Sequence, residues 1–256
     1  MSLVAETRPV LWQLQISHYN EKVRWALDYK RIPHTRRSLL PGVHMLIARR
    51  LAGVDTTPVV TIDGESIGDS SAILAALEER WPEPPLMPEN TLQRRRALRL
   101  EEFFDEELGP HIRRALYWEL LMRPDLVLPL FTNGQNVAAR TLLRGSFPVL
   151  KVGMRRTMNI HEDPSAESRD KVVEALDMLE KELDGRDYLV GNSFSIADLT
   201  AASLFYPLAG PPPEYPYPTI AAESVSEAAR EFMDSLTDRP GAHWVAEMYR
   251  RHRMPS

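Results

Sequence analysis

The chain contains no cysteine. This absence excludes disulfide bonds, cysteine-ligated metals and a cysteine nucleophile, so any thiol chemistry must use a thiol that a ligand supplies. The sequence also lacks an apolar run of about eighteen residues and an apolar signal core near its start, so we expect a cytoplasmic protein that does not bind membranes. Positive charge is not in excess: the net charge is −5 and the basic clusters are short and scattered, so nucleic acid is not an expected partner.

What is present indicates one large or two smaller globular domains. The chain has 256 residues, of which 43% are hydrophobic and 26% charged, which is ordinary for a globular protein with a sizeable core. Prolines number 21, and a cluster of them follows residue 81. Because proline-rich stretches are semi-rigid and common at domain boundaries, we expect a domain over residues 1–82, a linker over 83–91 and a second domain over 92–256.

The first of these domains alternates between strand and helix patterns. Asp63-Gly64, between two apolar runs, is the strongest short hairpin signal, and it makes the last two strands antiparallel. The expected elements are strands at 9–14, 34–40, 57–62 and 65–67, with helices at 17–30, 44–51 and from 69 onward. The order β-α-β-α-β-β-α predicts an α/β domain with a mixed four-stranded sheet.

Beyond the linker, strand patterns largely vanish and helical periodicity dominates. Gly109-Pro110 should interrupt the first long helix. Ser195 and Asp198 resemble a capping box that starts an apolar, buried helix. The expected helices span 91–122, 134–158, 165–184, 197–205, 224–236 and 241–252. We therefore expect an all-α second domain.

Ser17 lies where the first strand gives way to the first helix. A hydroxyl at a helix N-terminus lies beside free backbone N–H groups and the positive end of the helix dipole, and such a place can hold an anion, including a thiolate. Serine is also a preferred N-cap, so Ser17 can simply cap the helix. His18 and Asn20 flank the serine, and either can hydrogen-bond a sulfur or a substrate, or complete the cap.

At four places, in family order and spacing, the chain resembles the soluble glutathione S-transferases. Ser17 is similar to the serine of bacterial-like, serine-type members, whose hydroxyl faces the glutathione sulfur. Thr57-Pro58 is similar to the family's cis-proline turn, where the residue before the proline pairs through its backbone with the cysteinyl part of glutathione. Asp69-Ser70 is similar to the motif that holds the γ-glutamyl group, and residues 195–198 to the family's folding signature. The resemblance implies that the first domain is thioredoxin-like.

The resemblance also implies further residues of a glutathione site. The glycyl carboxylate of glutathione needs a cation, and His44 and Arg49 are our candidates. Tyr19 is the second choice for the catalytic hydroxyl, because the spacing to the following helix residues favours Ser17. Since position 17 is not cysteine, the thiol-transferase and dehydroascorbate-reductase chemistry of the cysteine-bearing classes is not expected.

The second substrate is expected where the helical domain meets the sheet. Polar and aromatic side chains on the first long helix are candidates for lining an apolar pocket suited to hydrophobic electrophiles, although each one taken singly is more often a core residue. These candidates are Phe103, Phe104, His111, Tyr117 and Trp118.

The predicted function is that of a glutathione-dependent transferase, a homodimer without a metal, in which the glutathione thiolate attacks an apolar electrophile in detoxification. Two alternatives stay open: a transferase-like fold that serves as a non-catalytic binding or scaffold protein, and a glutathione-dependent isomerase, dehalogenase or peroxidase. Arginine far outnumbers lysine, which is typical of a GC-rich genome. Some bacteria with such genomes use another low-molecular-weight thiol, so the identity of the thiol is also open.

Overall fold

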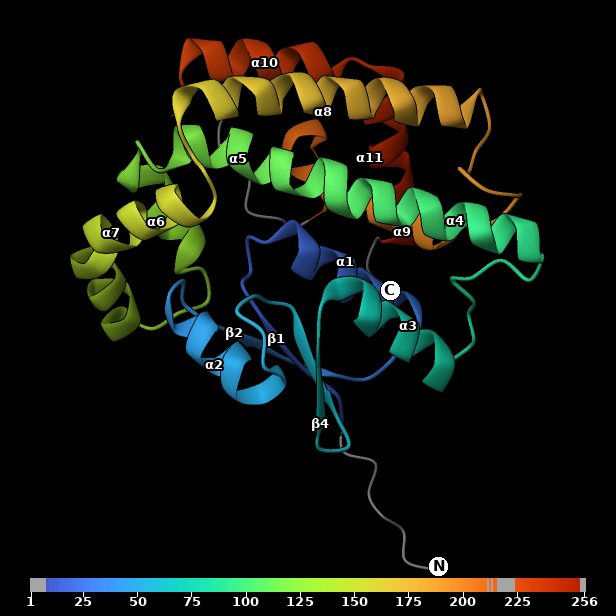
Figure 1. Cartoon of the computed structure of the whole chain (residues 1–256), viewed down its shortest axis with the longest axis horizontal. Coiled ribbons are helices and arrows are strands. Elements are labelled where there is room, and N and C mark those ends of the chain that lie inside the picture. Colours follow the sequence, from blue (N-terminus) through green and yellow to red (C-terminus); the bar gives the residue numbers. More distant parts are fainter. Residues whose placement is uncertain (1–7, 211, 213, 216–223, 254–256) are drawn as a thin grey trace, which may run out of the picture.

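The computed structural model describes residues 8–210, 212, 214–215 and 224–253. The first domain was expected to begin at residue 1 and the second to end at residue 256, and both of these ends lie outside the described residues. Its first part has the predicted element order and a four-stranded mixed sheet, which confirms the thioredoxin-like α/β fold (Figure 1). The elements are β1 (Val10–Gln13), α1 (His18–Tyr29), β2 (Thr35–Ser38), α2 (Val43–Ala52), β3 (Val59–Ile62), β4 (Glu65–Gly68) and α3 (Ser70–Arg80).

The sheet has the strand order β2-β1-β3-β4. Strand β1 is parallel to β2 and antiparallel to β3, and β3 and β4 form the predicted hairpin. Asp63 and Gly64, the two turn residues, both have positive φ angles, of 51° and 87°, as a type I′ turn requires. Helix α1 packs through Val23, Ala26 and Leu27, all fully buried, so its N-terminus is held at the end of β1.

The second part is helical, as predicted. Its elements are α4 (Thr91–Phe103), the π-helical turn η1 (Phe104–Leu108), α5 (Gly109–Leu120), α6 (Pro124–Phe131), α7 (Val137–Thr157), α8 (Glu162–Leu183), α9 (Ile196–Ala209), α10 (Glu227–Thr237) and α11 (Pro240–His252). The expected interruption at Gly109-Pro110 takes the form of η1, from which the chain continues directly into α5. Helix α6 begins at Pro124 and has no counterpart among the predicted helices.

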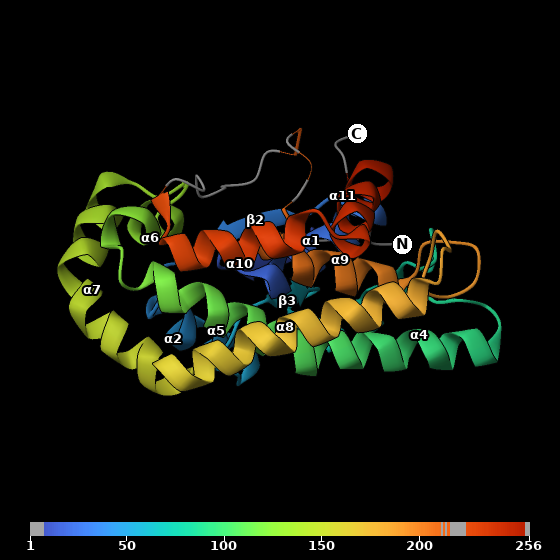
Figure 2. The same cartoon turned by 90° about the horizontal axis from the view of Figure 1, so that it is seen from above.

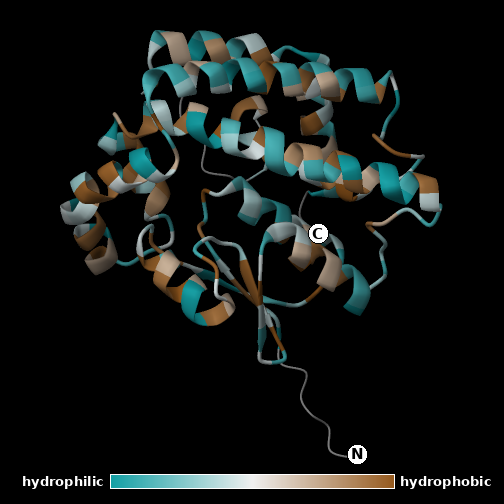
Figure 3. Ribbon diagram, in the orientation of Figure 1, coloured by the Kyte–Doolittle hydropathy of each residue, from teal (hydrophilic) through white to brown (hydrophobic). Residues whose placement is uncertain are grey.

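The helices form layers on one side of the sheet domain. Helix α8 lies alongside α5, and α6 and α7 form the end of the molecule farthest from the start of α4 (Figures 1 and 2). Figure 3 shows mainly hydrophilic residues along the outer helix α8. One large core joins the sheet domain to the helices, and a smaller core, which includes Leu143 and Phe147, lies under α6 and α7.

Helix α9 is the buried axis of the helical part, as its apolar sequence predicted. Its N-terminal capping box is present: the Asp198 carboxylate accepts a hydrogen bond from the Ser195 N–H (2.9 Å), and outside the box it also accepts from the Leu189 N–H (2.8 Å). Burial raises the pKa of Asp198 to about 6, against the opposing effect of these hydrogen bonds. No helix within the described residues is both long and apolar enough to cross a membrane.

Candidate active site

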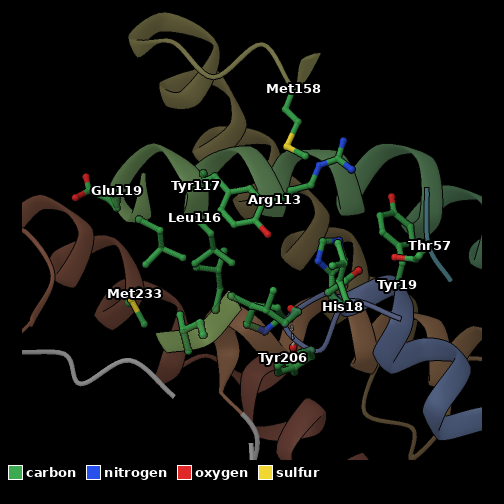
Figure 4. A pocket seen from close by; sticks show the side chains of 18 of the residues that line it. His18, Tyr19, Thr57, Arg113, Leu116, Tyr117, Glu119, Met158, Tyr206 and Met233 are labelled. Carbon is green, nitrogen blue, oxygen red and sulfur yellow. Dashed lines mark hydrogen bonds between the residues drawn. The ribbon is translucent and has the colours of Figure 1, made fainter. Parts of the chain in front are cut away.

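A cavity of about 470 Å³ lies between the sheet domain and the helices (Figure 4). One wall, which we call the thiol wall, comes from the start of α1, the turn before β3 and the start of α3. The opposite wall, which we call the helical wall, comes mainly from α5, α9 and α10. The predicted site residues that line the cavity are Ser17, His18, Tyr19, His44, Thr57, Pro58, Asp69, Ser70 and Tyr117.

Ser17 both caps α1 and faces the cavity. Its backbone is extended (φ −75°, ψ 128°), and its hydroxyl oxygen accepts a hydrogen bond from the Asn20 N–H at 3.4 Å. As an acceptor of that bond, the hydroxyl keeps its own hydrogen, which it can donate to a third group. The capping and the anion-binding interpretations of Ser17 are therefore compatible.

Thr57 lies beside Ser17 in the thiol wall, and the Thr57-Pro58 peptide bond is cis, as the resemblance implied. Asn20 is fully buried behind this wall and does not line the cavity. Its side-chain amide donates to the Thr57 hydroxyl at 3.3 Å. The structure therefore places Asn20 as a support for Thr57 rather than as a residue in contact with a ligand.

Asp69 and Ser70 form the third part of the thiol wall. Asp69 caps α3 by accepting from the Ala72 N–H at 2.9 Å, and it has a φ of 70°, which is unusual for a residue other than glycine. Ser70 is buried, and its hydroxyl donates to the Asp105 carboxylate at 3.3 Å. The start of α3 thus offers backbone N–H groups next to a carboxylate, a pair suited to a group that carries both charges.

Lys22 lies behind the thiol wall in a buried charge cluster that the sequence reasoning missed. Its fully buried ammonium donates to the carboxylates of Glu101 (2.5 Å) and Asp105 and to the Ser71 hydroxyl (3.1 Å). Burial raises the pKa of Asp105, although the Lys22 charge opposes this effect. Because the cluster joins α1, α3, α4 and η1, it fixes the helical part against the thiol wall. A lysine on the buried face of an amphipathic helix was the one signal for it.

His18 and Tyr19 connect the start of α1 to the start of α5 and to η1. The Tyr19 hydroxyl donates to the Asp105 carbonyl at 2.6 Å, and the His18 Nε2 lies 3.1 Å from the Gly109 carbonyl. A carbonyl only accepts, so Nε2 carries the proton. Burial and the nearby Arg113 lower the pKa of His18 to about 3, so the imidazole is neutral at neutral pH.

Burial and Asp105 also raise the pKa of Tyr19 well above its ordinary value. A Cβ on Gly109 would lie 2.1 Å from the Tyr19 hydroxyl oxygen, so this close approach requires glycine. The Tyr19 hydroxyl is thus already engaged as a donor, which leaves Ser17 as the better-placed hydroxyl for a ligand.

His44 and Arg49, the two residues expected to bind a glycyl carboxylate, differ in their position relative to the cavity. His44 lines the cavity, accepts from the Gly42 N–H at 3.1 Å, and has a pKa lowered by burial. Arg49 does not line the cavity; its exposed guanidinium pairs with Asp55 at the surface. The structure therefore does not bring Arg49 to the site.

Of the five candidates for the second-substrate pocket, only Tyr117 lines the cavity. Phe104 is fully buried in the main core, with Phe103 against it. His111 lies 3.1 Å from the Ser168 hydroxyl on α8, and Trp118 packs on the smaller core under α6 and α7. The helical wall consists instead of side chains that sequence reasoning did not select, including Arg113, Leu116, Met158, Tyr206, Phe232 and Met233.

These side chains come from helices that are distant in sequence. Tyr206 belongs to α9, while Phe232 and Met233 belong to α10. Figure 4 shows Arg113, Leu116 and Tyr117 projecting from α5. Among the described residues, no three histidine, aspartate or glutamate side chains converge in an arrangement that could hold a metal ion. The site thus combines a polar wall with a mostly apolar one.

Comparison with protein families gives two matches along the chain. Residues 11–85 match the model of the glutathione S-transferase N-terminal domain, and residues 145–227 match that of the C-terminal domain. Among individual proteins, maleylacetoacetate isomerase of Dictyostelium discoideum is 31% identical over 116 residues, which cover 42% of this chain and 51% of that protein. The chain spans about half the length of the relatives that it matches in this way.

Solved structures match over almost the whole chain. The β-etherase LigF of Sphingobium sp. strain SYK-6 superposes with a TM-score of 0.63 at 17% identity, over 94% of this chain and 99% of that one. A glutathione S-transferase of Methylobacterium radiotolerans, in complex with glutathione sulfonate, gives a TM-score of 0.57 at 23% identity, over 93% of each chain. At these identities the likeness shows that the fold is shared.

Proposed function

The chain belongs to the glutathione S-transferase family, and from this premise we propose that it activates the thiolate of glutathione for attack on an apolar electrophile. One observation carries the proposal. The Ser17 hydroxyl, at the N-terminus of α1, lines the same cavity wall as the cis Thr57-Pro58 turn and the start of α3. Three features that the sequence resemblance picked out separately therefore meet in one place.

The chemistry requires a donor for the thiolate rather than a base. A free thiol has a pKa near ~8.5, so little of it is ionised at neutral pH. Lowering this pKa by about two units takes on the order of 2.7 kcal/mol of differential stabilisation. A charge-assisted hydrogen bond of about 1.5–3 kcal/mol from the Ser17 hydroxyl, with the dipole of α1, is sufficient.

The remaining polar groups of the thiol wall fit the rest of the tripeptide. The backbone of Thr57 would pair with the cysteinyl part, and the N–H groups at the start of α3, with Ser70 and Asp69, would hold the γ-glutamyl carboxylate and ammonium. His18 and His44 also line this part of the cavity. A related structure with bound glutathione sulfonate supports glutathione as the thiol.

A second reaction is favoured by the names of the relatives. Three of the proteins matched over part of the chain are maleylacetoacetate isomerases, established or probable. An isomerase of this kind would use the same activated thiolate, which would add to the substrate and then leave. We propose isomerisation as the alternative activity of the same site, ahead of a non-catalytic scaffold role.

We also propose the organisation in which this activity takes place. Residues 1–82 would bind the thiol, the linker 83–91 would separate the domains, and residues 92–256 would supply the electrophile pocket. A cytoplasmic homodimer acting in detoxification is the accompanying proposal. Analytical ultracentrifugation of the full chain tests the dimer, since a monomer at micromolar concentration would contradict it.

The test of the activity uses 1-chloro-2,4-dinitrobenzene, an apolar electrophile whose conjugate with glutathione is coloured. The Ser17→Ala variant should lose about 10- to 100-fold in kcat/KM, because the donor to the thiolate is gone. Since Ser17 is also an N-cap, the matched control is Asn136→Ala, which removes the cap of α7 outside the cavity. Unchanged activity in Ser17→Ala, or an equal loss in Asn136→Ala, would contradict the proposed role of Ser17.

A further inference from the structure

Arg113 is a cavity-lining cation without a partner in the described part of the chain. It lies on α5 one turn before Tyr117, on the same face of the helix. Its Nε is buried and has no hydrogen-bond partner, and no carboxylate of the described residues lies within ion-pair distance of its guanidinium. The next residue behaves differently: the Arg114 guanidinium donates to the Ser168 hydroxyl (2.9 Å) and the Met158 carbonyl (3.1 Å).

The acidic side chains of the cavity do not neutralise Arg113. Asp69 is engaged as the cap of α3, and Asp105 is paired with Lys22. Glu106 and Glu119 also line the cavity, but they lie seven residues before and six residues after Arg113 and form no ion pair with it. Figure 4 shows Glu119 at the opposite end of the cavity-facing part of α5.

The surroundings of Arg113 strengthen the electrostatic interactions of its guanidinium. Met158 lies next to Arg113 in Figure 4, Leu116 lines the cavity one turn further along α5, and an apolar neighbourhood strengthens electrostatic interactions. The charge also reaches the thiol wall, because Arg113 contributes to the lowered pKa of His18, one residue from Ser17. A second guanidinium, that of Arg169 on α8, lines the cavity too and likewise has no hydrogen bond or ion pair among the described residues. Removing a cation partly from water without a counterion costs free energy, and an anionic ligand bound to the cation would offset that cost.

We propose that the electrophile of this enzyme carries a carboxylate on an apolar body, and that Arg113 binds this carboxylate, with Arg169 adding to the positive field of the cavity. The proposal rests on the proposed function, since it names the class of the second substrate. Arginine suits this role because its planar guanidinium donates to both oxygens of a carboxylate. Arg113 is thereby a specificity-determining residue, which places the carboxylate end of the substrate near the thiol wall.

Glutathione also carries carboxylates, so the experiment must separate the two sources. The probes are 4-phenylbutanoate and 4-phenylbutanamide, which have the same size and differ in charge. Isothermal titration of the full chain with each probe, in the absence and in the presence of glutathione, measures the preference for the carboxylate. A separate titration with glutathione alone measures the thiol site. Because the probes need no thiol, the carboxylate preference is measurable even if the proposed function is wrong.

The wild type should bind 4-phenylbutanoate about tenfold more tightly than the amide, the lower end of what a charge-assisted hydrogen bond contributes. Arg113→Gln should abolish this preference and leave the affinity for glutathione unchanged. Arg113→Lys should keep part of it, because the charge stays but the two-donor geometry is lost. The matched control is Arg140→Gln, which removes the same charge from an exposed position on α7 outside the cavity.

Three results would overturn the proposal. The first is a wild type that binds the two probes equally or binds neither. The second is an Arg113→Gln variant that keeps the wild-type preference while its melting temperature shows that it is folded. The third is a loss of glutathione affinity in Arg113→Gln, which would assign the arginine to the thiol. Failure of the proposed function has a different signature, namely no glutathione binding in the wild type.

Discussion

The two walls of the cavity differ in whether their polar side chains have hydrogen-bond partners within the protein. In the thiol wall, the polar side chains Ser17, Asp69 and Ser70 already take part in hydrogen bonds within the protein. The helical wall is mostly apolar, and its cation Arg113 has no partner among the described residues. Under the proposed function, the polar groups of the thiol wall are thus held in place before glutathione binds, whereas the charge of Arg113 would be paired only by the second substrate.

This difference follows from how each wall is made. The thiol wall uses the ends of neighbouring elements, a helix cap, a cis-proline turn and a second helix start, each defined by two or three adjacent residues. The helical wall draws on α5, α9 and α10, which are far apart in the sequence. A change of substrate can therefore arise in the helical wall without disturbing the thiol site.

The largest expected effect comes from cutting the charge cluster behind the thiol wall. Lys22→Met should lower the free energy of unfolding by about 3–5 kcal/mol, because Glu101 and Asp105 would stay buried without their cation. Denaturant unfolding of the wild type and the variant measures this difference in the free energy of unfolding. The control Lys171→Met removes an exposed lysine paired with Glu174 and should leave the free energy of unfolding almost unchanged, because solvent screens such a surface pair.

The same experiment compares the two walls directly. Met233→Ala trims a half-buried side chain of the helical wall and should cost only about 1 kcal/mol, because less apolar surface is lost. If Lys22→Met cost no more than Met233→Ala, the idea that the thiol wall is the more firmly fixed of the two would be wrong.

The next effect is a pH dependence from His18, which joins the two walls through the Gly109 carbonyl. Its pKa is about 3 in the folded state against an unperturbed 6.5, so between these values the unfolded chain binds a proton that the folded chain does not. Stability from this residue is therefore lost as the pH falls through that window, by about 2 kcal/mol between pH 7 and pH 5.

The variant His18→Gln isolates this contribution, because glutamine can still donate to the carbonyl but does not titrate. Chemical denaturation at several pH values should show a shallower loss of stability in the variant than in the wild type. Identical slopes for the two proteins would mean that His18 is not the titrating group.

A smaller effect than that of His18 is expected at Gly109, where α5 meets Tyr19 of α1. In Gly109→Ala the new Cβ would meet the Tyr19 hydroxyl oxygen at 2.1 Å and its ring carbon Cζ at 2.6 Å. Overpacking of this kind costs about 1–3 kcal/mol, of which the helix preference of alanine returns up to about 1 kcal/mol. Thermal unfolding should show a net loss. The control Gly153→Ala, in α7 with open space around it, should be neutral or stabilising.

The sequence predicts the elements that form the thiol wall because their signals are local. Alternating strands and helices, the Asp63-Gly64 turn and the cap at Ser17 each depend on a few neighbouring residues, and the elements follow the expected order along the chain in a mixed four-stranded sheet. Helix α6 was missed because Pro124 and Pro129 resemble helix breakers, although Pro124 opens the helix, where proline is tolerated.

The helical wall could not be predicted for a geometric reason. The π-helical turn η1 adds one residue to a helical turn, which rotates α5 by about 100° relative to a straight continuation of α4. A face projected from α4 therefore does not continue along α5, where Arg113 and Leu116 line the cavity while Phe103 and Phe104 pack in the main core. The contributions of α9 and α10 depend on tertiary packing, which spacing along the chain does not encode.

The most direct test of the account is the pKa of the thiol of bound glutathione. Ultraviolet absorbance of the thiolate, followed against pH in the complex, measures it for the wild type and for Ser17→Ala. We expect a midpoint about two units below that of free glutathione in the wild type and a value close to the free thiol, near ~8.5, in the variant. A wild-type midpoint equal to that of free glutathione, or the same lowered midpoint in both proteins, would contradict the account.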